Sequence, residues 1–201
     1  MNQTAQQYIS GLKNAYVENQ AEESWDHFEK IKHGATEENI EKLFGEYPDI
    51  PDAFVSLLKY VDGTYWREYE GKEIAFYFLG SDMPEYPYYL LSSEEMIEDK
   101  DMAVKYYSDY IERKYREVAI DEKITHTTKN LKWLHFSDCM NNGGTSQLFI
   151  DFSPSQKGTK GQIVRFLHDP DEFSVIADSF EEYLHQLIDK EYEFINQDIL
   201  G

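Results

Sequence analysis

The chain has 201 residues, a length typical of one domain that can bury a core without disulfides. Its 39 acidic and 19 basic residues give a net charge of -20 at pH 7. A chain this negative repels nucleic-acid phosphates and anionic membranes and attracts basic proteins, so we expect no direct binding to nucleic acid or membrane. The alternative is that the charge only keeps the protein in solution, and composition alone does not separate the two roles.

Two further features predict a reducing compartment. Cys139 is the only cysteine, which excludes an intrachain disulfide and a cysteine-ligated metal cluster. The N-terminus lacks the basic and apolar parts of a signal peptide, and no apolar run approaches the roughly 18 residues of a membrane span. We therefore expect a cytoplasmic protein.

The chain is predicted to be helical up to Gly63. Residues 1–30 carry apolar side chains at loose helical spacing, and Thr36 is a good N-cap because two glutamates follow it in the first turn. Pro51 starts the next helix, and Gly63 ends it because glycine tolerates the left-handed backbone conformation. We thus expect a helical hairpin with a proline joint.

Aromatic-rich, partly alternating segments after Gly63 predict strands. The first two are separated by a short Glu-Gly-Lys turn, so we expect them to form an antiparallel hairpin. The expected strands are 64–69, 73–79, 86–91, 132–136, 147–152 and 162–168.

Two more helices are expected among and after these strands. The serine pair 92–93 caps the first, which is predicted to run unbroken from 94 to about 118, and Ser179 caps the second. Residues 191–201 look like an optional tail. This order of elements favours an α+β fold, with a mainly antiparallel, mixed sheet covered by helices. Because the sequence has no repeat and no dividing linker, we expect a single domain over 1–201.

The sequence contains no recognisable active site or metal site. None of its six histidines has the spacing of a metal-binding pair. His135 and Asp138 form the best cluster, with His168 as a partner if their strands are neighbours, but a spacing of three along a strand favours opposite faces for the first two. Residues 157–161 hold two glycines without the spacing of a phosphate loop. We therefore predict no catalytic residue, no metal, no cofactor, and a protein that is not an enzyme.

Three stretches of the sequence carry a resemblance to one known family. The first is 35–63, a capped helix followed by Ile50-Pro51-Asp52-Ala53-Phe54, an apolar helix and a closing Asp62-Gly63. The second joins Phe149-Ile150-Asp151-Phe152-Ser153-Pro154 to Lys157-Gly158 and Gly161-Gln162-Ile163, and the third is 176–184. These motifs, in this order, are similar to those of the SUKH superfamily, the bacterial relatives of the yeast Smi/Knr cell-wall regulators.

The resemblance covers a core of about 34–190. The chain differs from the family pattern by an extra N-terminal helix and by a long helical insertion at 94–128. The resemblance implies protein binding, because bacterial members are typically immunity proteins that neutralise a polymorphic toxin. A basic, nuclease-type toxin domain suits a chain of charge -20, so we expect such a cognate toxin as the partner.

Aromatic residues beside carboxylates have the composition of an interface hot spot. The expected binding residues lie on the first hairpin and in the loop that follows it: Asp62, Trp66, Glu68, Glu70, Glu85, Tyr86 and Tyr88. The alternative is that Trp66 and Tyr88 belong to the core. Two other functions stay open, a scaffold or regulator of cell-envelope synthesis and an enzyme with an unrecognised site in the sheet cleft.

Overall fold

The computed structural model describes residues 1–65, 67–69, 72–74, 76–139 and 146–200, with the backbone alone at 67–69 and 72–74. The helices of these residues are α1 (Gln3–Glu18), α2 (Glu22–Ile31), α3 (Glu37–Glu46), α4 (Asp52–Tyr60), α5 (Ser93–Glu98), α6 (Met102–Ile111), α7 (Phe180–Asp189) and α8 (Gln197–Leu200). The strands are β1 (Arg67–Tyr69), β2 (Lys72–Ile74), β3 (Tyr89–Leu90), β4 (Ala119–Ile120), β5 (Trp133–Cys139), β6 (Ser146–Asp151), β7 (Gln162–Leu167) and β8 (Glu172–Ala177).

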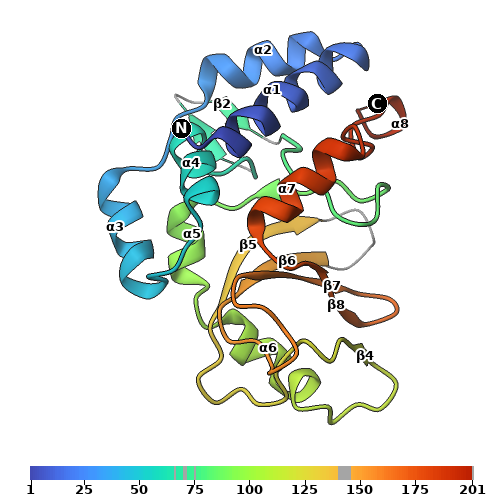
Figure 1. Cartoon of the computed structure of the whole chain (residues 1–201). Helices are drawn as coiled ribbons and strands as arrows, with labels where there is room; N and C mark the ends of the chain where they lie inside the picture. The colour runs from blue at the N-terminus through green and yellow to red at the C-terminus, as the bar shows by residue number, and fades with distance from the viewer. Residues whose placement is uncertain (66, 70–71, 75, 140–145, 201) are drawn as a thin grey trace.

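One mixed sheet forms the centre of the molecule (Figure 1). Its strand order is β3-β5-β6-β7-β8-β4, with antiparallel pairing throughout except for the parallel pair β4 and β8. β1 and β2 pair separately as the antiparallel hairpin that the sequence predicts. The α+β fold class is therefore confirmed.

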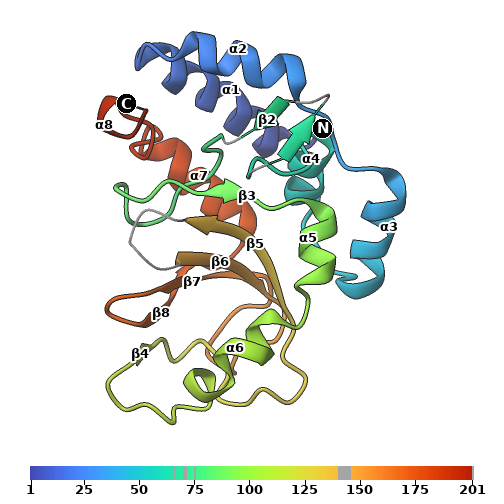
Figure 2. The same cartoon turned by 180° about the vertical axis from the view of Figure 1, so that it is seen from behind.

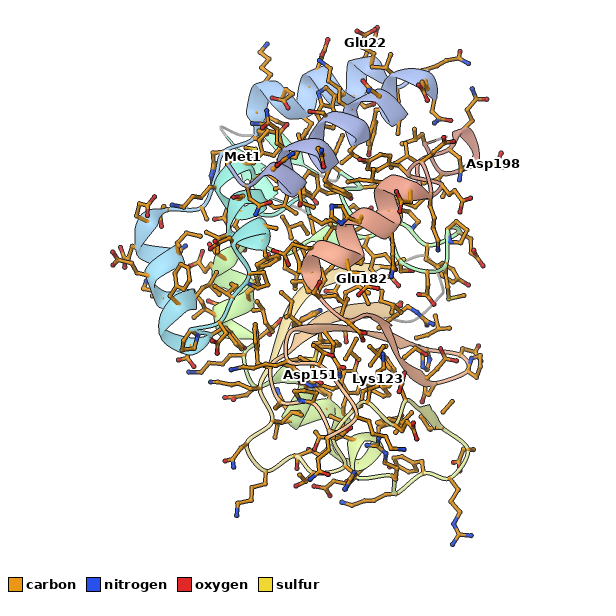
Figure 3. The ribbon with its side chains drawn as sticks, viewed as in Figure 1. Met1, Glu22, Lys123, Asp151, Glu182 and Asp198 are labelled. Atoms are coloured by element: carbon orange, nitrogen blue, oxygen red, sulfur yellow. The ribbon has the colours of Figure 1, made fainter. Side chains whose placement is uncertain are left out.

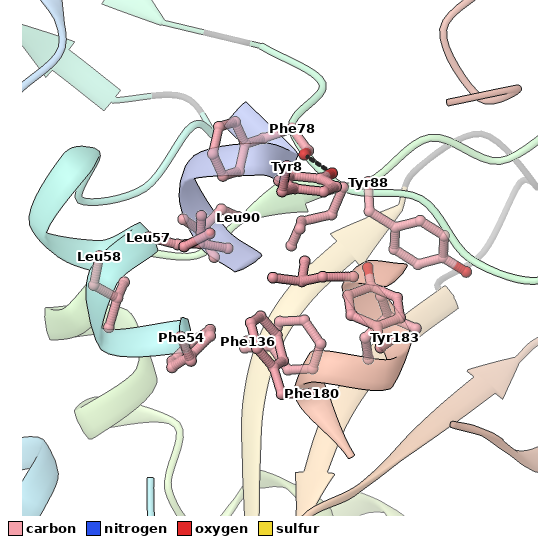
Figure 4. Close-up of a cluster of buried hydrophobic side chains, with 14 of the residues drawn as sticks. Tyr8, Phe54, Leu57, Leu58, Phe78, Tyr88, Leu90, Phe136, Phe180 and Tyr183 are labelled. Atoms are coloured by element: carbon pink, nitrogen blue, oxygen red, sulfur yellow. Dashed lines mark hydrogen bonds between the residues drawn. The ribbon is translucent and has the colours of Figure 1, made fainter. Parts of the chain in front are cut away.

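The sheet buries a different apolar cluster on each face because successive side chains of a strand point in opposite directions. On one face, Leu148 and Ile150 of β6 belong to the large cluster under α1, α4 and α7, part of which is shown in Figure 4. On the other face, Phe149 belongs to a second cluster that packs under α6. The two clusters explain why β6 is buried along its whole length.

The predicted helix starts are confirmed at atomic detail. The Thr36 hydroxyl accepts a hydrogen bond from the backbone of Asn39, and Ser179 caps α7 in the same way from Glu182. Ser92 forms a complete capping box with Glu95 at the start of α5. Pro51 occupies the N-cap position of α4.

Two predicted helices are each divided in the structure. The helix expected over 1–30 is α1 and α2, separated at Gln20, which has a positive φ of 62°. The prediction of one helix over 94–118 is wrong. α5 ends at Glu98 and α6 starts at Met102, and α6 itself ends seven residues before 118 (Figure 2). β4 and β8, at the far edge of the sheet, were not predicted from the sequence.

The C-terminal segment packs into the core instead of forming a loose tail. Tyr192, Phe194 and Ile195 are each 5% exposed or less. The Tyr192 hydroxyl donates to the Tyr8 carbonyl of α1 at 2.9 Å, and the Asn19 amide donates to the Ile195 carbonyl at 2.9 Å. The two ends of the chain therefore pack against each other. Within the described part of the chain, the helices are too short or too polar to cross a membrane.

Candidate partner-binding surface

The loop between β2 and β3 is held in place by three tyrosine hydroxyls from distant helices. Tyr8 donates to the Phe78 carbonyl at 2.6 Å, Tyr16 to the Tyr77 carbonyl at 2.8 Å, and Tyr183 to the Gly80 carbonyl at 2.6 Å. All three tyrosines are buried, and burial raises their pKa values above the ordinary range, so each remains a neutral donor. These bonds satisfy backbone carbonyls that a buried loop would otherwise leave unpaired.

A buried arginine fixes the next part of the loop. The Arg165 guanidinium of β7 donates to both carboxylate oxygens of Asp82, at 2.7 and 3.1 Å, and to Glu172 of β8 at 2.8 Å. Bidentate pairs of this kind are geometrically specific. Because the Arg165 side chain is 5% exposed and Asp82 is 38% exposed, the pair joins the interior to the surface.

The exposed part of the loop lies beside the C-terminal segment. Ser81 and Pro84 line the same small hollow as Leu187, Glu193 and Phe194. Glu85 is exposed and Tyr86 is partly buried. We define the loop surface as Asp82, Glu85, Tyr86, Asp189, Glu191 and Glu193.

The expected binding residues separate into three groups. Asp62 is 3% exposed and accepts a hydrogen bond from the Ser93 backbone at 2.7 Å. Tyr88 is fully buried, with its hydroxyl 2.6 Å from that of Ser146, and burial raises its pKa to about 12. These two side chains therefore belong to the interior and do not form the surface.

The other expected residues are at the surface or outside the described side chains. Glu85 and Tyr86 lie on the loop surface defined above. Trp66 and Glu70 lie outside the described residues, and for Glu68 the structure describes the backbone of β1 alone. The C-terminal carboxylates, by contrast, were not expected from the sequence, because their segment resembles a tail.

Carboxylates differ in how they are neutralised across the molecule. On α3, Glu37 pairs with Lys59, Glu38 with Lys42, and Glu46 with Lys100 and Lys132. On α2, and at and after the last residue of α7, no ion pair with another described residue neutralises Glu22, Glu23, Asp26, Asp189, Glu191 or Glu193. Figure 3 shows Glu22 of α2 and Asp198 of α8 at the same end of the molecule. These six carboxylates therefore add uncompensated negative charge to this helical end.

A second polar cluster lies beneath α6. His135 and Asp138, expected on opposite faces, lie on the same face because a β-bulge between His135 and Ser137 shifts the register of β5 against β6. His135 Nε2 is 3.0 Å from Asp138 Oδ1, which also accepts from the Gln147 amide at 2.9 Å. The Tyr107 hydroxyl of α6 donates to Gln147 in turn. The cluster thus fastens α6 to the sheet.

His168 lies away from this cluster. It is exposed beyond the end of β7, and its Nδ1 is 2.7 Å from Asp171. β6 separates β5 from β7, so the two histidines do not meet. Within the described residues, no three His, Cys, Asp or Glu side chains gather closely enough to hold a metal ion.

A family model matches most of the chain. Residues 34–186, about three quarters of the chain, match the SMI1/KNR4 family (SUKH-1). The chain belongs to the SMI1/KNR4 family. No curated protein matches it.

The SMI1/KNR4 motif around Asp151 has a structural role here. Gln162 donates to the Asp151 carboxylate at 2.9 Å and to the Lys123 carbonyl at 3.2 Å, and Figure 3 shows Asp151 and Lys123 near each other. Burial raises the pKa of Asp151 to about 6, although hydrogen bonds from Ser153 and Gln162 oppose the shift. Gly158 lies so close to Lys123 and Gln162 that no side chain fits there. The motif therefore ties the β6–β7 connection to the segment before β5.

A hollow of about 690 Å³ opens beside this connection in the SMI1/KNR4 fold. Arg113 lines it, but its guanidinium donates to four backbone carbonyls, those of Ile111, Asp121, Ile124 and Thr125. Lys157 lines it as well and pairs with Glu122. Arg113 and Lys157 are thus occupied by contacts within the protein. Neither of them forms a nucleophile–base pair.

Proposed function

We propose that this SMI1/KNR4 protein is an immunity protein that neutralises a cognate toxin domain with a basic surface. Members of the family are generally non-enzymatic immunity or regulatory proteins, which supports a binding role. The observation that carries the proposal is the set of unneutralised carboxylates at the helical end, in a chain of net charge -20. Carboxylates left without partners in the free protein are available to the cations of another protein.

The fixed backbone of the loop surface favours tight binding. Three tyrosine hydroxyls and the Arg165–Asp82 pair already order the loop in the free protein. Association therefore costs little further conformational entropy at this site. Glu85 and Glu193 would meet the basic residues that a nuclease-type toxin uses to hold phosphates, so that binding covers the toxin's active surface.

Charge reversal at the loop surface tests the proposal. The purified product of the adjacent gene is titrated with the wild-type protein and with Glu85→Lys and Glu193→Lys. We expect each reversal to weaken binding by roughly tenfold or more, because it places like charges in the interface.

The matched control is Glu41→Lys, which makes the same change of net charge on exposed α3, across the molecule in Figure 1. It should leave the affinity within about twofold of wild type, because salt screens the effect of a charge that lies far from the interface. If the wild-type protein does not bind or inhibit the toxin, the proposal is refuted. If it binds and all three variants bind alike, the loop surface is not the interface.

A further inference from the structure

A hollow of about 500 Å³ opens between the α1–α2 turn and α8. Asn19, Ala21, Glu23 and Ser24 line it from the turn and the start of α2, and Leu200 lines it from α8. Figures 1 and 2 show α8 beside the end of the molecule where α1 turns into α2. We call this feature the turn hollow. Its volume lies within the range of roughly 300–1,000 Å³ that is typical of ligand sites in proteins.

One acceptor of the turn hollow is held in a fixed orientation. The side-chain amide of Asn19 donates to the Ala15 carbonyl and to the Ile195 carbonyl, both at 2.9 Å. Because these two bonds use both amide hydrogens, the amide cannot rotate without breaking one of them. Among the described residues, no donor contacts Asn19 Oδ1. This oxygen is therefore available at the hollow as an oriented acceptor.

The charges of the turn hollow favour a cation. Glu23 is exposed and has no ion pair with another described residue, and none of the described residues that line the hollow is basic. The N-terminus of α2 also lies here and carries roughly half a positive charge, which alone would favour an anion. Glu22 and Glu23 stand in the first turn of α2, and their two negative charges outweigh that dipole.

The apolar groups of the turn hollow suit the stem of a long basic side chain. Ala21 and Leu200 are partly buried and pack against the large core cluster. Lysine and arginine lay their methylene groups along such a surface while the charged head reaches polar atoms. A basic side chain therefore matches both halves of the lining, whereas a free metal ion would match only the oxygens.

The turn hollow lies beside the loop surface. Ile195, the carbonyl of which binds Asn19, follows Glu193 of the loop surface after one residue. Two residues of chain span at most about 7 Å. A partner that covers Glu193 can therefore reach the hollow with a neighbouring side chain.

We propose that the turn hollow receives a lysine or arginine side chain of the basic partner. The charged head lies between the Glu23 carboxylate and the Asn19 amide oxygen, and the methylene stem lies along Ala21 and Leu200. This inference rests on the proposed function and adds a specific anchor to it. The lining residues all lie outside 34–186, so the family match does not assign this site.

The test uses three variants, and the probe is the purified product of the adjacent gene, titrated by calorimetry. Glu23→Gln removes the carboxylate, and Ser24→Trp fills the hollow without a change of net charge. Asp26→Asn is the matched control, because it removes an exposed carboxylate of α2 that does not line the hollow. We expect Glu23→Gln and Ser24→Trp each to bind roughly tenfold more weakly, and Asp26→Asn to stay within about twofold of wild type. Melting temperatures close to wild type show that the three variants fold.

The outcomes separate the two proposals. Wild-type affinity in Ser24→Trp overturns the inference, because a filled hollow cannot receive a side chain. Equal losses in Glu23→Gln and Asp26→Asn also overturn it, because the carboxylates would then act only through their long-range field. Both results leave the proposed function intact. Failure of the wild-type protein to bind overturns the proposed function and, with it, this inference.

Discussion

The buried imidazole of His135 lies among more negative groups than its own strand supplies. Asp138 of β5 contacts its Nε2, and the Asp99 carboxylate, from the joint between α5 and α6, lies 3.8 Å from its Nδ1. Burial lowers the pKa of His135, but the two carboxylates outweigh this effect and raise it to about 9. The histidine is therefore charged at neutral pH and attracts the carboxylates of both Asp138 and Asp99.

The His135 charge predicts a loss of stability at alkaline pH. Because the folded pKa of about 9 exceeds the unfolded value of 6.5, the contribution is complete below pH 6.5 and is lost as the pH rises to about 9. From this shift, we expect the unfolding free energy of wild type to fall by on the order of 3 kcal/mol relative to His135→Gln across that window. Urea denaturation at several pH values measures the difference. A parallel pH profile for the two proteins would contradict the prediction, and exposed His126→Gln is the control.

Two glycines predict opposite effects of the same substitution. In Gly158→Ala the new methyl group overlaps the Lys123 carbonyl and the Gln162 side chain, so we expect a loss of about 1–3 kcal/mol of unfolding free energy. Gly45 lies within α3 with open space around it, so Gly45→Ala should gain about 0.5–1 kcal/mol through helix propensity. Chemical denaturation measures both. Equal changes in the two variants would show that packing at Gly158 is not tight.

Among the elements, the ends of helices could be predicted better than their continuity. Thr36, Ser92 and Ser179 indicate helix starts, because each hydroxyl accepts a hydrogen bond from the backbone N–H three residues later. The division between α5 and α6 has no such signal, because the residues between them, 99–101, are all compatible with a helix. There the packing of α6 on the second face of the sheet decides the path of the chain.

The sheet and the candidate surface were predictable to a similar, partial degree. The central strands follow from their apolar runs, whereas β8 has only two buried residues, Phe173 and Ala177, and gives a weak pattern. The β-bulge after His135 depends on pairing with β6 and is invisible in a single strand. Glu85 and Tyr86 were predicted at the surface, but the proximity of their loop to Glu193, through Ser81 and Pro84, follows from tertiary contacts alone.

The C-terminal segment predicts a large effect from one substitution. Phe194 is 2% exposed and packs so closely on Gly80 that no side chain fits at that glycine. We expect Phe194→Ala to lower the unfolding free energy by about 3–5 kcal/mol, as for other core phenylalanines. Tyr106→Ala removes a ring that is 60% exposed and should cost far less. If urea denaturation gives equal losses for the two variants, the segment does not belong to the core.

Across the whole molecule, the chain adds a charged layer to the family fold. The family match, 34–186, leaves out α1, α2 and the segment that follows α7. These parts pack on one another through Tyr192, Tyr8 and Asn19. They also carry most of the unneutralised carboxylates described above, including Glu22 and Glu193. The additions therefore both enlarge the core and concentrate negative charge at one end.

This charge distribution predicts that association with the proposed toxin partner depends strongly on salt. Unpaired surface carboxylates steer a basic partner over distances comparable to the Debye length, which is about 10 Å at 0.1 M salt and shortens as salt is added. Stopped-flow measurement between low and high ionic strength should show an association rate constant that falls by roughly tenfold or more, with a smaller change in the dissociation rate constant. A triple variant with glutamine at Glu22, Glu191 and Glu193 should show an association rate constant that depends less steeply on salt. The control is a triple glutamine variant of the paired α3 residues Glu37, Glu38 and Glu46, which should stay closer to the wild-type salt dependence. A rate constant independent of salt would show that the charge of -20 does not act in partner capture.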